Sequence, residues 1–243
     1  MIKFFRKIRQ NLLSEGKTAN YLKYAIGEIV LVMIGILLAL QVNNWNESRK
    51  QHIEETVLLR TMRTDFEMKN KQLLQEYEYN KKLHDISSQF IMSQLNHQKD
   101  TFAIEDVLYF GDYFPVSTHI NSLDVALESN MVNIFRSDSL VDMLRKLKAD
   151  FVNLEIDKDY LDEFWTSNLI PYFQESGLSI HRFSLIQKGI VPSTEILNSI
   201  DMYEFANRIS DIVSVEFLWL KKQEIILEDM NTIMRMINEE LTR

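Results

Sequence analysis

Hydrophobic residues form one nearly uninterrupted run near the N-terminus, between Tyr24 and Trp45, and the only charge inside it is Glu28. As a helix the run would be roughly 32 Å long, close to the thickness of the bilayer core. Aromatic residues flank it, with Tyr21 and Tyr24 before it and Trp45 after it, where interfacial aromatics gather. The pattern predicts a transmembrane helix over residues 24–45.

Two other interpretations of this run are a buried helix of a soluble protein and a cleavable signal peptide. A cleavage site needs small residues three and one positions before the cut. The sequence that follows the run, Leu40–Trp45, contains no such pair. The pattern therefore favours an uncleaved signal-anchor.

One face of the predicted anchor carries its small residues. Positions three and four apart share a face of a helix, and one such stripe consists of Ala25, Glu28, Val32, Gly35, Ala39 and Val42. Gly35 and Ala39 form the small-x-x-x-small pair that lets two membrane helices approach closely. A carboxylate facing lipid is unfavourable, so the stripe predicts contact with a second membrane helix. In the other interpretation Glu28 lies near enough to Tyr24 to reach the cytoplasmic interface.

A long amphipathic segment follows the anchor. No glycine occurs between Gly35 and Gly111, and no proline occurs before Pro115. Apolar residues recur at helical spacing, with charged residues between them: Leu59, Met62, Phe66, Leu73, Tyr77, Leu83, Phe90 and Ile91. We expect one long outgoing helix over residues 46–98.

The C-terminal segment, residues 201–243, has the same character. Asp201 and Glu204 form a possible capping box at its start. Apolar residues then recur at the four-three spacing of a heptad row: Phe205, Ile209, Ile212, Trp219, Ile226, Met230, Ile233 and Ile237. Two positions of this row are polar, Glu216 and Gln223. A second row runs beside it: Ala206, Val213, Leu220, Leu227, Met234 and Leu241. Because this apolar face is wider than a two-stranded seam, it predicts a returning helix in a bundle.

The middle region, residues 99–200, contains every proline and half of the glycines. It predicts a helical head with shorter helices near 103–110, 121–130 and 138–175, the last capped by Ser137. The stretch 179–193 is the least helical and predicts irregular structure or a small hairpin. The expected fold is all-α: a transmembrane helix, then an elongated helical hairpin or bundle with a small head.

Charge is distributed unevenly along the chain. Residues 1–23 carry six basic side chains and one acidic one, whereas residues 46–243 carry a net charge of −12. The residues expected at the lipid headgroups are Lys3, Arg6, Lys7, Arg9, Lys23, Tyr24 and Trp45. This asymmetry predicts a cytoplasmic N-terminus and an exported body. Residues 2–13 form either a helix lying on the membrane surface or a disordered basic tail. The acidic body disfavours nucleic acid as a partner.

No motif for catalysis, cofactor binding or metal binding stands out, so we expect no enzyme activity. The chain has no cysteine, and no two of its five histidines lie within seven residues of each other. Phosphate-binding glycine loops and Gly-x-Ser-x-Gly are also missing from the sequence. The acidic stretch 155–163 lacks the glycine and spacing of a calcium loop, which favours a solvated helix face.

Two stretches, "MIKFFRKIRQNLLSEGK" and "YLKYAIGEIVLVMIGILLALQVNNWNE", resemble the N-terminal signature of domain-of-unknown-function family 6090, an uncharacterised single-span membrane family of Bacteroidota. A looser similarity covers residues 119–150, where Asn130 stands at the place of the family's glycine after Ser129. Asparagine also tolerates the left-handed conformation of a helix C-cap. The resemblance implies a bacterial envelope membrane protein and adds no catalytic residue. With the charge asymmetry, we expect a single-pass protein of the bacterial inner membrane with its body in the periplasm.

These features lead to two hypotheses about function. The first is a non-catalytic, membrane-anchored envelope protein, a scaffold or accessory interaction subunit. Its partners would be the lipid bilayer and either a second copy of the chain or another membrane protein. The alternative is a ligand-sensing or transport-accessory protein whose head binds a small molecule.

Overall fold

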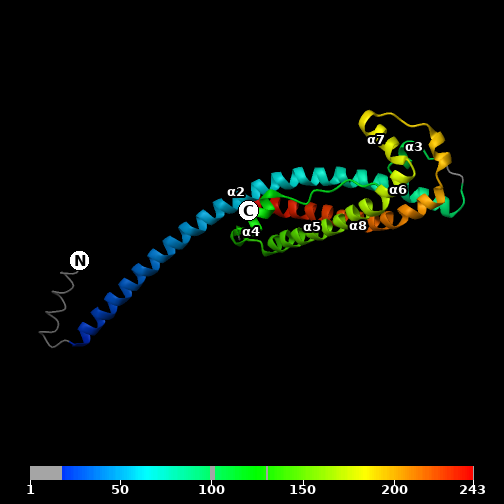
Figure 1. Ribbon diagram of the computed structural model, residues 1–243. Coiled ribbons are helices and arrows are strands. Elements are labelled where there is room, and N and C mark those ends of the chain that lie inside the picture. The colour runs from blue at the N-terminus through cyan, green and yellow to red at the C-terminus, as the bar shows by residue number, and fades with distance from the viewer. Residues whose placement is uncertain (1–17, 99–101, 130, 243) are drawn as a thin grey trace. The chain divides into compact units, whose positions relative to one another are not determined.

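The computed structural model describes residues 18–98, 102–129 and 131–242, and it confirms the all-α class, because these residues form helices and no strand (Figure 1). The chain divides into two compact units, the first ending at Glu55 and the second beginning at Thr56. The helix α2 (Thr18–Leu95) contributes to both.

The first unit contains the apolar run predicted to cross a membrane. Within α2 an 18-residue window has a mean hydropathy of 2.4, and none of that window is buried. The described residues contain one helix that is long and apolar enough to span a bilayer. Its exposed apolar side chains are consistent with a single-pass anchor.

The core of the second unit is formed by three long helices. These are the part of α2 after Thr56, α5 (Asp138–Phe164) and α8 (Met202–Thr242), which lie side by side (Figure 1). Asn70 contacts Asn231, and further along α2 His84 contacts Glu216, so α8 runs antiparallel to α2. The buried positions of α2 include most of those predicted from the periodicity: Leu59, Met62, Phe66, Leu73 and Phe90.

The α8 helix follows its predicted pattern closely. The Asp201 carboxylate accepts hydrogen bonds at 3.0 Å from the backbone N–H groups of Tyr203 and Glu204, which are unpaired donors at a helix start. All eight apolar residues of the heptad row are buried. The polar residues Glu216 and Gln223 are also buried, because they share the face that packs against α2 and α5.

The head consists of short elements. In chain order they are α3 (Ile104–Val107), α4 (Asn121–Glu128), η1 (Met131–Ile134), the π-helical turn η2 (Trp165–Leu169), α6 (Ile170–Glu175), α7 (Leu178–Lys188) and η3 (Thr194–Ser199). Ser137 caps α5 as predicted, with its Oγ 3.3 Å from the N–H of Leu140. The predicted helix 138–175 is interrupted by η2, and the C-cap expected at Asn130 lies outside the described residues.

The prediction of irregular structure for 179–193 was wrong for most of that stretch. Leu178–Lys188 forms α7, and only residues 189–193 are irregular. Glycines in the left-handed conformation stand at both ends, Gly177 with φ 78° and Gly189 with φ 62°. They stop the helix after 11 residues, which is too short for periodicity alone to indicate it.

Polar side chains of α2 hold the extended segment between α3 and α4. The Asn80 side chain accepts from the N–H of Phe114 at 2.6 Å and donates to its carbonyl oxygen at 3.0 Å. The Ser87 hydroxyl accepts from the N–H of Gly111, and Asp65 accepts from the N–H of Ser122. These contacts satisfy backbone groups that have no helical partner.

An aromatic cluster joins the head to the long helices. Phe90 of α2 stacks on Phe110 at 4.6 Å between ring centroids, and Phe205 of α8 stacks on Tyr172 of α6 at 5.4 Å. Phe173 meets Phe205 edge to face. Such pairs add to the hydrophobic gain of burial.

Gly111 is the glycine whose replacement should be most costly. Its φ is +72°, and an added Cβ would lie 3.2 Å from both Ile212 Cγ2 and Leu169 Cδ1. We expect Gly111→Ala to lower the free energy of unfolding by about 2–4 kcal/mol, through strain and overpacking together. Gly189→Ala is the control, because its φ is also positive but its Cβ meets nothing within 4 Å. Equal losses in thermal or urea unfolding of both variants would contradict this packing role.

Candidate functional site

The predicted contact stripe of the anchor is accessible in the structure. Val32, Gly35, Ala39 and Val42 are exposed, and Ala25 and Glu28 are partly exposed. A Cβ added to Gly35 would meet nothing within 4 Å, so the small-residue face is open to a second helix. Residues on the other faces of the anchor are exposed as well, so exposure alone does not distinguish the stripe.

The predicted headgroup residues are only partly described. Lys23 and Trp45 are exposed on α2. Lys3, Arg6, Lys7 and Arg9 lie outside the described residues, as do the expected surface helix 2–13 and the side chain of Tyr24.

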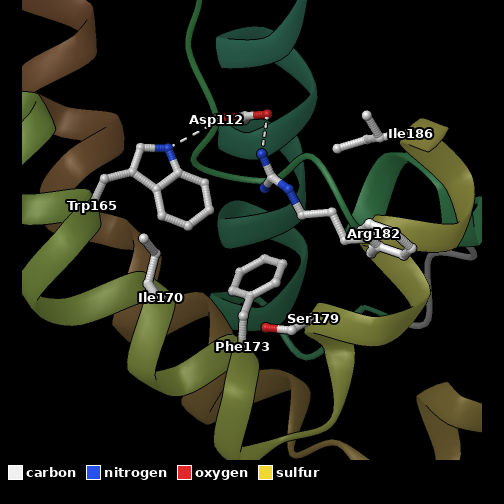
Figure 2. Close-up of a pocket in the computed structure, with 8 residues that line it drawn as sticks. Asp112, Trp165, Ile170, Phe173, Ser179, Arg182 and Ile186 are labelled. Atoms are coloured by element: carbon white, nitrogen blue, oxygen red, sulfur yellow. Dashed lines mark hydrogen bonds and ion pairs between the residues drawn. The ribbon is translucent and has the colours of Figure 1, made fainter.

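A cleft of about 330 Å³ opens in the head between η2, α6 and α7 (Figure 2). Its walls are mostly apolar or aromatic. The lining residues are Asp112, Trp165, Ile170, Phe173, Ser179, Arg182, Phe183 and Ile186. Clefts of this size and character accept small ligands or apolar side chains of a partner.

Arg182 ties the walls of this cleft together (Figure 2). Its guanidinium donates to Asp112 at 2.7 Å and to the carbonyl oxygen of Leu108 at 3.3 Å, and it lies 4.7 Å from the ring centroid of Trp165. The Trp165 indole N–H donates to the other oxygen of Asp112 at 3.2 Å. Both carboxylate oxygens therefore have donors, and the cleft offers mainly apolar surface.

Three apolar residues of the cleft walls are exposed, and three more exposed apolar residues lie on α7 or directly after it. Together we call these six residues the head surface. It consists of Ile170, Ile180, Phe183, Ile186, Ile190 and Val191, all exposed. Between Glu163 and Glu195 the sequence contains a single carboxylate, Glu175, in a body that is otherwise strongly acidic. A clustered apolar area with few charges is typical of an interaction site.

Sequence reasoning did not identify this cleft. Arg182 and Asp112 are 70 residues apart, and no local pattern pairs them. The available signal was the pair of glycines, Gly177 and Gly189, which bracket a segment of helical length. Within it, Ser179, Arg182, Phe183 and Ile186 recur at the spacing of one helix face.

The acidic stretch 155–163 is more than the solvated face that was expected. Glu155 accepts from the Thr118 hydroxyl at 2.8 Å, Asp157 pairs with Lys222, and Asp162 accepts from the Tyr113 hydroxyl. These carboxylates link α5 to the extended segment and to α8. Within the described ranges no group of three or more His, Asp or Glu side chains is placed to hold a metal ion.

A buried carboxyl group faces a histidine between α8 and α2. Glu216 Oε2 lies 3.8 Å from His84 Nδ1, which is too long for a hydrogen bond, and the Glu216 side chain is 3% exposed. Among the residues that the structure describes, neither Glu216 oxygen has a hydrogen-bond partner. Burial raises the pKa of Glu216 from 4.5 to about 7; the nearby His84 opposes this rise and Asp112 adds to it.

The raised pKa makes the stability of the bundle depend on pH. The neutral carboxyl is favoured in the folded state, so its contribution is fully present below about pH 4.5 and is lost as pH rises through about 7. We expect Glu216→Gln to stabilise the protein progressively more as pH rises from about 4.5 to about 7, reaching about 3 kcal/mol at pH 8. Urea unfolding at pH 5, 6.5 and 8 measures this.

Glu228→Gln is the matched control, since it makes the same change at an exposed position of α8. Its effect should be small and nearly constant across this pH range. A stabilisation by Glu216→Gln that does not grow with pH would contradict the buried-carboxyl account.

Comparison with known proteins adds one finding. No curated protein and no solved structure was found to match the chain. A family model does match, over about a third of the chain that includes most of the anchor stripe, the rest of α2 and α3. Residues 28–110 match the model of a family of unknown function, DUF6090, which confirms the resemblance inferred from the N-terminal residues.

Proposed function

We propose that this protein is a non-catalytic, membrane-anchored interaction protein whose helical body binds an apolar surface of a partner through its head. The observation that carries this proposal is the head surface: six exposed apolar residues in and beside a mainly apolar cleft, from a chain segment, residues 164–194, that contains one carboxylate. Leaving such an area in water is unfavourable, and covering it with a partner removes that cost.

The anchor supports the same proposal. Its apolar residues are exposed along the run, which suits lipid as the surrounding medium. The basic N-terminal segment and the acidic body favour a single-pass signal-anchor in a bacterial inner membrane, with a cytoplasmic N-terminus and a periplasmic body.

The anchor stripe gives a second contact within the membrane. Gly35 and Ala39 would let a neighbouring helix approach, and Glu28 on the same face would be shielded from lipid. The neighbour would be a second copy of this chain or another membrane protein.

The proposed topology predicts which positions an impermeant maleimide reaches. The chain contains no cysteine, so single cysteines at Ser14 and Ser137 are unambiguous reporters. In spheroplasts we expect Ser137→Cys to react and Ser14→Cys to react only after the membrane is permeabilised. Reaction of Ser14→Cys alone would reverse the topology.

The proposed interaction predicts protein adducts at the head surface. A photoreactive amino acid in place of Phe183, in the full chain in native membranes, should crosslink to a protein. The same amino acid in place of Tyr160, an exposed aromatic residue of α5, should not. Adding Gly35→Ile should lower the adduct yield about threefold to tenfold, because the bulky side chain separates the anchor from its neighbour.

Gly27→Ile is the matched control in this assay, since Gly27 is also an open glycine of the anchor but lies outside the stripe. Equal yields in the Gly35→Ile and Gly27→Ile variants would remove the stripe from the proposal. The same yield at Phe183 and Tyr160 would contradict the head surface.

A second candidate function is favoured by the size of the head cleft. About 330 Å³ between Trp165, Phe173 and Arg182 is enough for a small, mainly apolar molecule. In that case the head would act as a ligand sensor or transport accessory. No protein adduct at Phe183, together with a small molecule retained by the purified protein, would favour this function over the first.

A further inference from the structure

A groove runs between α2 and α8, separate from the head cleft. Its larger cavity, of about 350 Å³, is lined by one face of each helix. The α2 residues are His84, Ser88, Ile91 and Met92, and the α8 residues are Ser210, Val213, Ser214 and Phe217. A second cavity of about 160 Å³ shares Ile91 and Ser210 with it and continues toward Leu95 and Tyr203. Gln94, Ala206 and Asn207 also line this second cavity, so both parts of the groove combine polar and apolar side chains.

The serines of α8 offer the groove only hydrogen-bond acceptors. The Ser210 hydroxyl donates to the carbonyl oxygen of Asn207 at 2.9 Å, and the Ser214 hydroxyl donates to that of Ser210 at 2.8 Å. Each hydroxyl has a single proton, which is thereby used within the helix. The lone pairs of the two hydroxyl oxygens therefore remain available to accept hydrogen bonds from a ligand in the groove.

The α2 side of the groove also offers hydrogen-bond acceptors. His84 Nδ1 faces Glu216, and a proton on Nδ1 is the arrangement a buried carboxylate favours. His84 Nε2 then accepts from the Ser88 hydroxyl, 3.2 Å away. With this tautomer the Ser88 proton is also used, and Glu216 lies behind His84 with two oxygens that lack hydrogen-bond partners.

We propose that this groove binds a small organic cation, a primary ammonium that carries an apolar tail. The ammonium has three donors and no acceptor, which complements the oxygens of Ser88, Ser210 and Ser214. The aromatic ring of Phe217 lines the same cavity, and the Glu216 carboxylate, next to His84, supplies the opposite charge. The tail would lie over Ile91 and Leu95, which are apolar residues on the α2 side of the second cavity.

Binding of such a cation is linked to a proton. Glu216 interacts electrostatically with His84 of α2 and with Asp112 of the segment after α3. Its charge also contributes to the raised pKa of Tyr113 in that segment. A neutral Glu216 leaves no negative charge for the ligand. The ammonium therefore displaces a proton. Affinity should rise about tenfold from pH 6 to pH 8, as the carboxyl with a pKa of about 7 ionises.

The test is calorimetric titration of the full chain in lipid nanodiscs, with empty nanodiscs subtracted. The probes are butylammonium, 1-butanol and butyrate, which share a tail and differ in charge. We expect butylammonium to bind at least about tenfold more tightly than 1-butanol, and butyrate to bind more weakly still. Titrations in two buffers of different ionisation enthalpy should show release of up to about one proton. Equal affinity for the ammonium and the alcohol, or no pH dependence, would overturn the proposal.

Three variants separate the groove from general attraction by the acidic body. Glu216→Gln should weaken butylammonium binding about tenfold or more and remove its pH dependence. Asp211→Asn, which removes one exposed charge from the same helix, should leave both unchanged. Ser214→Ala, at an exposed position where folding is not at risk, should weaken the ammonium but not the alcohol. Equal weakening by Asp211→Asn and Glu216→Gln would show surface attraction and overturn the assignment.

Discussion

The antiparallel packing of α8 against α2 and α5 is the constraint on which the rest of the second unit depends. The heptad row of α8 is completely buried, and Trp219 adds a hydrogen bond from its indole N–H to the Leu154 carbonyl oxygen of α5. The same register carries Glu216 and Gln223 into the core, where their polar atoms lack partners. An apolar pair at these positions would pack with less desolvation cost. Burial of Glu216 and Gln223 is thus a stability cost that the surrounding apolar burial offsets. Glu216 also lies next to His84, which lines the groove.

The head depends on this packing because its own elements are too short to be stable alone. The aromatic cluster around Phe205 and Phe90 joins α6 and the segment after α3 to the long helices, through Tyr172, Phe173 and Phe110. Arg182 then links α7 to Asp112 and Trp165, with the π-helical turn η2 presenting Trp165 to the cleft. Such turns occur often at functional sites. The head surface thus consists of exposed apolar residues on a head that is held in place by the aromatic cluster and by the contacts of Arg182, as a docking surface requires.

The segment that matches the family model includes some of the candidate sites and leaves out others. Residues 28–110 contain most of the anchor stripe and the α2 wall of the groove, including His84 and Ser88. Arg182, α7 and the α8 wall lie beyond the matched segment. The anchor and α2 therefore form the part that this chain shares with the family model. The head surface rests on the geometry of this chain alone.

The sequence by itself determined the elements whose signals are local. The apolar run of the anchor, the caps at Ser137 and Asp201, and the buried row of α8 all follow from spacings of three and four residues, which the helix geometry converts directly into faces. Only the tertiary structure decided which residues distant in sequence meet. His84 with Glu216, Arg182 with Asp112, and Tyr113 with Asp162 depend on the register and separation of packed helices. Periodicity fixes the face of a helix but not its partner, so the cleft and the groove became visible only once the helices were placed against one another.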